Sequence, residues 1–245
     1  MATQSDSLLG RRALVTGATS GIGRAVALQL AREGAEVIVH GRSERRGSET
    51  SSEIHDAGGQ ALFLAADLND PVALRRLADE SGEVDVLVNN AGISWFGPTE
   101  DLDVDTFEAM FATNVRAPYF LVAAIAPKMA AKGAGSIINV GSMVGQIGIS
   151  GAAAYGSTKA SLASMTRSWA AEFGSHGVRI NTVASGPAYT NIGPAERTTL
   201  SGGTTLLRRA AAPEEIAEVV TFLASSRASY VTGATIAADG GRAAI

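Results

Sequence analysis

The sequence predicts an α/β fold, a doubly wound parallel sheet of seven strands with helices on both faces. Three observations point to it. Seven short apolar runs recur along the chain, they alternate with segments of helical periodicity, and most of them are continuously apolar. Continuous apolar runs are typical of parallel strands that are covered on both faces. Strand–helix alternation at this spacing indicates βαβ units.

The predicted elements follow one another in a regular order. The strands are expected at Ala13–Val15, Val37–Val39, Ala61–Leu64, Val84–Val88, Ser136–Val140, Val178–Val183 and Thr235–Ala237. Helical patterns cover Gly23–Glu33, Pro71–Ser81, Asn114–Lys132 and Ala152–Phe173, and a polar helical segment follows the second strand. One long irregular segment runs from Gly186 to Ala212. Because loops of that length are otherwise uncommon, we expect it to bind the substrate.

Length and composition indicate a single domain over residues 1–245. The net charge of −4 argues against a nucleic-acid partner, which would require a basic face. The chain has no cysteine, and its three histidines lack metal-ligand spacing, so we expect no metal site. The first ten residues carry no apolar signal core, and Gly133–Thr158 lacks the sustained apolarity of a membrane span. We therefore expect a cytoplasmic protein that has no membrane partner.

A glycine-rich turn joins the first strand to the first helix. Its spacing is Gly-x-x-x-Gly-x-Gly, over Thr16–Gly23. Glycines let the backbone approach a pyrophosphate, and the free N–H groups at a helix start attract its charge. The predicted contacts are Gly17, Thr19, Ser20, Gly21, Ile22 and Gly23. Such turns also occur without a ligand, so the motif alone does not establish a dinucleotide site.

The end of the second strand favours NADP(H) over NAD(H). An acidic residue there normally holds the ribose hydroxyls of NAD, but this strand ends Val39-His40-Gly41-Arg42. The planar fork of Arg42 suits a 2′-phosphate. The alternative is that Arg42 is merely solvated at a helix start. Just past the third strand, Asp67-Leu68 is predicted to accept a hydrogen bond from the adenine amino group.

The predicted catalytic end contains Ser142, Tyr155 and Lys159. The tyrosine and the lysine are four residues apart in a predicted helix, so both side chains lie on one face. A neighbouring ammonium favours the phenolate, so we expect Lys159 to lower the pKa of Tyr155 and make it a usable acid/base. Ser142 follows a strand and can hold the substrate oxygen. The Tyr-x-x-x-Lys pair by itself is common, and only the order of all these motifs gives it weight.

In that order the sequence resembles the short-chain dehydrogenase/reductase family, from about Gly10 to Gly241, which has a Rossmann-type fold. The resemblance rests on Thr16–Gly23, Asp67, Asn89-Asn90-Ala91-Gly92, Asn114, Ser142, Tyr155, Lys159, Asn181 and Asp239-Gly240-Gly241. It implies a catalytic tetrad of Asn114, Ser142, Tyr155 and Lys159. In this tetrad Tyr155 protonates the substrate oxygen and Ser142 polarises the carbonyl. Lys159 also binds the nicotinamide ribose, and Asn114 anchors a water that leads to solvent.

The resemblance also implies further contacts. Asn90, Ala91 and Gly92 would line the adenosine side, and Pro187 and Thr190 would border the nicotinamide. Family members commonly assemble as tetramers, so a homotetramer or homodimer is expected. The chain departs from the family where Ser185 replaces a proline after the sixth strand. This departure affects the predicted contacts between this loop and the nicotinamide ring.

The predicted substrate is a small ketone or secondary alcohol. Its pocket is expected to draw on Ser94, Trp95 and Phe96, on Met143 and Gln146, and on Tyr189 and Ile192. Trp95 and Phe96 could equally be packing residues. The overall pattern is also similar to the 3-oxoacyl-carrier-protein reductases, which gives one alternative. Those enzymes tend to place arginines at the positions of Gly133 and His176, so a free substrate is favoured. A non-catalytic dinucleotide-binding sensor is the other alternative.

Overall fold

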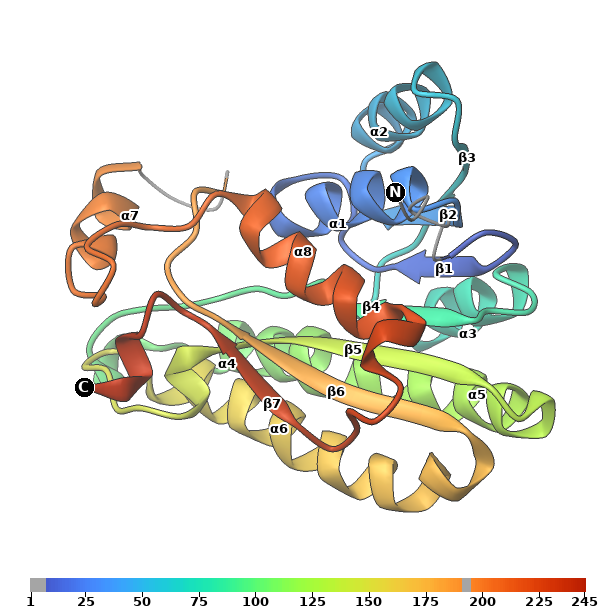
Figure 1. Ribbon diagram of the computed structural model, residues 1–245. Coiled ribbons are helices and arrows are strands. Elements are labelled where there is room, and N and C mark those ends of the chain that lie inside the picture. Colours follow the sequence, from blue (N-terminus) through green and yellow to red (C-terminus); the bar gives the residue numbers. More distant parts are fainter. Residues whose placement is uncertain (1–7, 191–194) are drawn as a thin grey trace.

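Seven parallel strands form one sheet in the order β3-β2-β1-β4-β5-β6-β7, which confirms the predicted fold class (Figure 1). The computed structural model describes residues 8–190 and 195–245. The strands are β1 Arg12–Val15, β2 Glu36–Gly41, β3 Gln60–Ala65, β4 Val86–Asn89, β5 Gly135–Ser142, β6 Val178–Ser185 and β7 Thr235–Ala238. The chain winds outward from β1 to β3 on one side and from β4 to β7 on the other. This reversal leaves a crevice beyond the carboxyl ends of β1 and β4, where ligands of such sheets bind.

Helices cover both faces of the sheet, as expected. They are α1 Gly21–Arg32, α2 Glu44–Asp56, α3 Pro71–Glu80, α4 Val104–Phe111, α5 Ala117–Lys132, α6 Ala153–Phe173, α7 Ala195–Gly202 and α8 Pro213–Ala224. Alternate residues of β1 serve two separate cores, because successive side chains of a strand point to opposite faces. Val15 packs in the core under α1 and α8, whereas Leu14 packs in the core under α3, α5 and α6. Figure 1 shows α1 and α8 on one side of the sheet and α5 and α6 on the other.

The helices α4 and α5 are joined by one turn of π-helix over Ala112–Arg116. The combined stretch Val104–Lys132 is long and apolar enough to cross a membrane by length and composition, but half of its most apolar window is buried in the fold. Its α5 part packs against α3, α6 and β5. The stretch therefore serves as a core helix of the sheet. Rare π turns are often found at functional sites, and this one contains Asn114.

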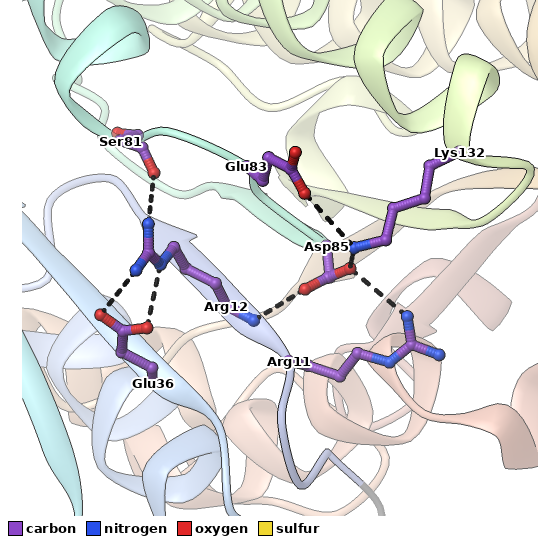
Figure 2. Close-up of polar contacts among 7 residues, drawn as sticks. All are labelled: Arg11, Arg12, Glu36, Ser81, Glu83, Asp85 and Lys132. Atoms are coloured by element: carbon purple, nitrogen blue, oxygen red, sulfur yellow. Dashed lines mark hydrogen bonds and ion pairs between the residues drawn. The ribbon is translucent and has the colours of Figure 1, made fainter.

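A cluster of charged residues lies at the amino ends of β1 and β4 (Figure 2). Asp85 accepts hydrogen bonds from the backbone N–H of Arg12 at 2.9 Å and from the Lys132 ammonium at 2.7 Å. Arg11 donates a third at 3.3 Å. The side chain of Asp85 thus bonds the backbone of β1 just before β4 begins. Strand β4 begins at Val86, two residues after the predicted start at Val84.

The segment from Gly186 to Ala212 is not wholly irregular, which corrects the expectation of a structureless loop. It contains the helix α7, and its residues 191–194, Ile192 among them, lie outside the described part of the chain. The two ends of the segment are held together. Ala188 pairs with Ala211, and the backbone N–H of Tyr189 donates to the Ala211 carbonyl at 2.9 Å. The loop after β6 is therefore fixed beside the start of α8.

Candidate active site

The glycine-rich turn lies at the carboxyl end of β1, in the crevice between β1 and β4. Gly17 and Gly21 have positive φ angles of 65° and 52°, which other residues rarely adopt. A Cβ on Gly23 would lie 2.2 Å from Nδ2 of Asn90 and 2.3 Å from the Gly17 carbonyl oxygen. The helix therefore starts so close to β4 that only glycine fits at this position. The Gly-x-x-x-Gly-x-Gly spacing thus places glycine where the turn packs directly against the chain at the end of β4.

The start of α1 fits a pyrophosphate. Its N-cap is Ser20, whose side chain makes no capping hydrogen bond, and the first turn contains no acidic residue. The first N–H groups of the helix therefore keep their partial positive charge for a ligand. Thr19 precedes the N-cap, and Gly21, Ile22 and Gly23 form the first turn of the helix, while their contacts with a dinucleotide stay a prediction. The residues present fit a dinucleotide phosphate at this position.

Asn90 has a role that the sequence did not reveal. Its side-chain amide donates to the carbonyl oxygens of Thr16 at 2.9 Å and Gly17 at 3.2 Å. The Thr16 hydroxyl in turn accepts from the backbone N–H groups of Asn90 and Ala91, both at 3.0 Å. Asn90 thus spends its amide on shaping the glycine turn. Its neighbours Ala91 and Gly92 continue along the crevice towards the catalytic side chains.

The predicted adenosine contacts lie at the ends of β2 and β3. Arg42 follows β2, is exposed, and has no hydrogen-bond or ion-pair partner among the described residues. Its guanidinium is free for a 2′-phosphate. Asp67 is exposed, and one of its carboxylate oxygens accepts from the Asn69 backbone at 3.0 Å. Leu68 is buried, so its side chain packs in the core and only its backbone can reach a ligand.

Two of the predicted catalytic side chains interact with each other. The Ser142 hydroxyl at the end of β5 is close enough to the Tyr155 hydroxyl on α6 for a hydrogen-bonding interaction that acts to lower the tyrosine pKa. Between them in sequence, the short 3-10 turn Met143–Gly145 packs tightly on α6. A Cβ on Gly145 would lie 2.9 Å from the Lys159 backbone, so glycine allows the close approach that aligns serine and tyrosine.

The pKa of Tyr155 differs from the expectation. Burial raises it, and the hydrogen bond from Ser142 only partly opposes that effect. Lys159 is buried one helical turn further on, with its ammonium 5.8 Å from the centre of the tyrosine ring and bonded to the Val140 carbonyl at 2.9 Å. Burial also lowers the pKa of Lys159 to about 8. The prediction of a lowered tyrosine pKa is therefore wrong for these residues on their own, because burial of the phenol raises the pKa by more than the interaction with Ser142 lowers it.

Asn114 is buried in the π turn and joins the loop after β4 to the helix α6. Its Oδ1 accepts from the Ile93 backbone N–H at 2.9 Å, and its Nδ2 donates to the Ile93 carbonyl at 2.8 Å. Nδ2 also donates to the Thr158 hydroxyl at 3.0 Å, and Thr158 donates to the Tyr155 carbonyl at 2.7 Å. Thr158 was not predicted as a site residue. Together the two side chains hold the first turns of α6, which carry Tyr155, against the loop after β4.

Gly92 lies between Asn114 and Lys159. A Cβ added there would lie 3.2 Å from the asparagine Oδ1 and 3.5 Å from the lysine Nζ. All four residues of the predicted tetrad are therefore gathered at the carboxyl ends of β4 and β5. The side chain of Asn114 is engaged by protein partners, and its anchoring of a water stays a prediction.

The loop after β6 reaches back to the glycine turn. A Cβ on Gly21 would lie 3.0 Å from the Thr190 side chain, so Thr190 borders the helix start. Pro187 accepts a hydrogen bond from the Ala211 backbone at 2.8 Å through its carbonyl. Ser185, which stands where the family has proline, bonds the Gly186 carbonyl with its hydroxyl at 3.0 Å. The hydroxyl thus makes a local bond at the position where the proline ring would restrict the chain.

Some of the predicted substrate residues are exposed at the site, whereas others pack within the protein. Phe96 packs on Tyr155, with ring centres 5.5 Å apart, and Ser94 and Gln146 are exposed. Trp95 instead folds over its own loop, since a Cβ on Gly97 would lie 2.7 Å from its ring. Met143 is buried and packs under the site. Tyr189 is exposed and its hydroxyl bonds Thr199 of α7 at 3.1 Å.

Comparisons with known proteins cover nearly the whole chain. The family model described as enoyl-(acyl carrier protein) reductase matches residues 17–243. The cis-4-hydroxycyclohexanecarboxylate dehydrogenase of Sinomonas cyclohexanicum is 37% identical, over 98% of this chain and 99% of that protein. The 3-oxoacyl-[acyl-carrier-protein] reductase of Vibrio cholerae is 39% identical, over 96% and 98%. Among solved structures, a blue fluorescent protein from a metagenomic library in complex with NADPH matches with a TM-score of 0.91. It is 36% identical over 97% of this chain and 99% of that chain.

Proposed function

Because the chain belongs to the short-chain dehydrogenase/reductase family of oxidoreductases, which act on CH–OH and C=O groups, we propose that it interconverts a small ketone and a secondary alcohol with NADP(H). The observation that carries the proposal is the grouping of Ser142, Tyr155 and Lys159, in which the serine interacts with the tyrosine and the lysine ammonium lies 5.8 Å from the centre of the tyrosine ring. When bound, NADP(H) supplies or accepts the hydride. The remaining steps belong to side chains of this chain.

Tyr155 acts as the general acid in the reductive direction. Burial raises the pKa of its phenol, so the hydroxyl keeps its proton at neutral pH and can give it to the substrate oxygen. Ser142 bonds the same oxygen and stabilises the charge that develops on it. Both groups are fixed before the substrate arrives, since the turn Met143–Gly145 is packed on α6. Pre-organised donors of this kind cost no reorganisation during the reaction.

Lys159 and Asn114 support the tyrosine. The buried lysine places a positive charge one helical turn from the phenol, which favours the phenolate left after proton transfer. We propose that it also holds the nicotinamide ribose, as family resemblance implies. Asn114 positions the turn through Thr158 and Ile93. Its link to solvent through a water belongs to the same proposal.

NADP(H) is proposed over NAD(H) because the exposed Arg42 has no partner among the described residues and no carboxylate ends β2. The NADPH complex of a structural relative supports this choice. The test is to titrate the protein separately with NADPH and NADH. A preference for NADPH of about tenfold, about 1.4 kcal/mol, is expected. Equal or tighter NADH binding would leave Arg42 without this role, and binding of neither would overturn the proposed reaction.

The Tyr155→Phe variant separates an enzyme from a non-catalytic dinucleotide-binding sensor. It removes the proton donor and keeps the ring that packs on Phe96. We expect turnover to fall by at least about a hundredfold while NADPH binding is retained. A sensor would show no turnover to lose, and turnover that survives the change would contradict the mechanism.

A second candidate substrate is an acyl group on a carrier protein, which the match to a 3-oxoacyl-carrier-protein reductase favours. The positions expected to carry docking arginines hold Gly133 and His176. Gly133 ends α5 with a φ of 74°, a conformation suited to glycine. An acidic carrier therefore finds no arginine at either position. Equal rates with a carrier-bound substrate and a simple thioester of the same acyl group would favour the free substrate.

We further propose that the protein is cytoplasmic and assembles as a homotetramer or homodimer. The exposed aromatic side chains of Tyr119 and Phe120 on α5 support an assembly through this helix, as family resemblance implies. Light scattering at several protein concentrations measures the mass directly. A monomer throughout would contradict the proposal.

A further inference from the structure

A positively charged side chain of α7 lies over the aromatic wall of the catalytic site. The guanidinium carbon of Arg197 is 4.7 Å from the centre of the Phe96 ring. Phe96 in turn packs on Tyr155 with ring centres 5.5 Å apart. The two distances together place the guanidinium no farther than about 10 Å from the centre of the catalytic ring. Arg197 is therefore within reach of a small substrate held by Tyr155.

The charge of Arg197 has no protein partner among the described residues. Several other arginines in the same half of the chain have partners. Arg209 binds Glu215 through both terminal nitrogens, and Arg179 donates to the carbonyl of Ser225. Within the described residues, no carboxylate lies within 4.0 Å of the guanidinium of Arg197, although Glu196 is its neighbour in sequence. A guanidinium stacked on a ring keeps its edge N–H groups free for an acceptor in its plane.

Among the described side chains expected to face the substrate, none offers a carboxylate to this guanidinium. The side chains expected to face the substrate are uncharged, namely Ser94, Phe96, Gln146 and Tyr189. The hydrogen bond between Thr199 and Tyr189 connects α7 to the loop after β6, so Arg197 stands on an element tied to the site. The chain as a whole carries a net charge of −4. A local cation at the mouth of the site therefore selects an anion that the rest of the surface would repel.

We propose that Arg197 binds a carboxylate of the substrate, so that the preferred substrates are keto acids and hydroxy acids. This inference rests on the proposed function. The planar guanidinium matches a carboxylate with two parallel hydrogen bonds. The distance to Tyr155, at most about 10 Å, leaves room for acids whose carboxylate is several bonds from the reacting carbon.

The test compares keto acids with their uncharged methyl esters in the presence of NADPH. Suitable pairs are 4-oxocyclohexanecarboxylate and 5-oxohexanoate with the corresponding esters. We expect the wild-type protein to prefer each acid by about tenfold or more in kcat/KM, the size of a charge-assisted hydrogen bond. Arg197→Gln should lose that preference mainly through a higher KM for the acid, while the esters are reduced at unchanged rates.

Two further variants separate charge from structure. Arg197→Lys keeps the charge without the planar fork, and it should keep part of the preference for the acid. Arg75→Gln on α3 removes an equally exposed arginine that is remote from the site, and it should behave as wild type. The dissociation constant of NADPH should be the same in all variants. A loss that affects acid and ester equally in Arg197→Gln would assign Arg197 a structural role and overturn the inference.

The other outcomes are also decisive. Equal use of acid and ester by the wild-type protein would overturn the inference while leaving the proposed reaction intact. NADPH binding without turnover of either acid would count against the carboxylate site alone. Failure to bind NADPH would contradict the proposed function itself.

Discussion

The backbone N–H of Gly17 donates a hydrogen bond to Nδ1 of His40 at 3.2 Å. The other ring nitrogen, Nε2, lies 3.2 Å from the Ala66 carbonyl oxygen and so carries the proton. The buried ring is therefore neutral, with one nitrogen accepting and the other donating. Because Gly17 opens the glycine turn and Ala66 precedes Asp67, His40 joins the phosphate end of the proposed cofactor site to its adenosine end.

We expect the stability of the protein to fall as the pH drops from about 6.5 to about 4. Burial lowers the pKa of His40 from 6.5 to about 4, against the opposing effects of the Ala66 hydrogen bond and the Asp67 charge. Between these values the unfolded chain binds a proton that the folded chain does not. The linked loss is about 3 kcal/mol over the whole window, and the contribution is fully present above pH 6.5. Urea unfolding at pH 7.5 and pH 5 measures it.

His40→Gln tests the assignment, because glutamine does not titrate. This variant should be less stable at pH 7.5, but its further decline to pH 5 should be smaller than that of wild type by about 2 kcal/mol. His176→Gln removes an exposed histidine remote from the turn and serves as the control. Parallel declines in wild type and His40→Gln would show that another group is responsible.

Arg42→Ala should weaken NADPH binding and leave NADH binding unchanged. The exposed guanidinium has no protein partner to lose among the described residues, so its removal affects only the proposed 2′-phosphate contact. A lost charge-assisted hydrogen bond is worth about 1.5–3 kcal/mol, or at least about tenfold in the dissociation constant. Arg45→Ala is the control, because Arg45 pairs with Glu49 on the next helical turn. Equal weakening of both cofactors would contradict the assignment.

Thr158→Val should reduce turnover more than cofactor binding. The substitution keeps the shape of the side chain but removes the acceptor of Asn114 and the donor to the Tyr155 carbonyl. We expect a loss of about 1–3 kcal/mol in stability. A misplaced catalytic turn should also lower kcat by about tenfold.

Thr166→Val is the matched control for this prediction. Thr166 is also buried on α6 and bonds Asn139 and Thr182, but it lies two turns beyond the catalytic residues. It should cost similar stability and leave kcat unchanged. If both variants lose kcat equally, Thr158 has no specific positioning role.

Patterns that repeat along the chain made the sheet predictable. Continuous apolar strands and the glycine turn are local signals, and the seven predicted strands were found within a few residues of their expected bounds. The order of motifs likewise brought together Ser142, Tyr155 and Lys159. Arg42 is exposed at the end of β2 and Thr190 lies against Gly21, and their contacts with a dinucleotide stay predictions.

Contacts between distant segments could not be predicted in the same way. His40, Thr158 and Arg197 belong to no sequence motif. His40 is 23 residues from its partner Gly17. Thr158 and Arg197 contact Asn114 and Phe96, which lie in other parts of the chain. The helix α7 was also missed, because its eight residues are mostly polar and its periodicity is weak. The prediction of a lowered pKa for Tyr155 was wrong for a related reason. Spacing in a helix gives the neighbouring charge but not the burial that opposes it.

The charged cluster at the amino edge of the sheet gives a last prediction, about stability without function (Figure 2). Asp85→Asn should destabilise the fold by about 2–3 kcal/mol, because it weakens the bonds to Lys132, Arg11 and the Arg12 backbone and leaves the charges facing a neutral group. Burial would raise the pKa of Asp85, but these hydrogen bonds hold it below the usual value. Its stabilisation is therefore present above about pH 4 and is lost as the carboxylate is protonated at lower pH.

Glu83→Gln is the control for this cluster. Glu83 meets Lys132 at 4.0 Å and its side chain is 86% exposed, so its removal should change stability by no more than about 0.5 kcal/mol. Neither substitution should alter the dissociation constant of NADPH, because the proposed cofactor site lies at the opposite, carboxyl edge of the strands. Chemical unfolding at pH 7 and pH 3 together with NADPH titration measures all three quantities. Weaker NADPH binding by Asp85→Asn in its folded state would show that the two edges of the sheet are coupled, against the separation argued from the strand order.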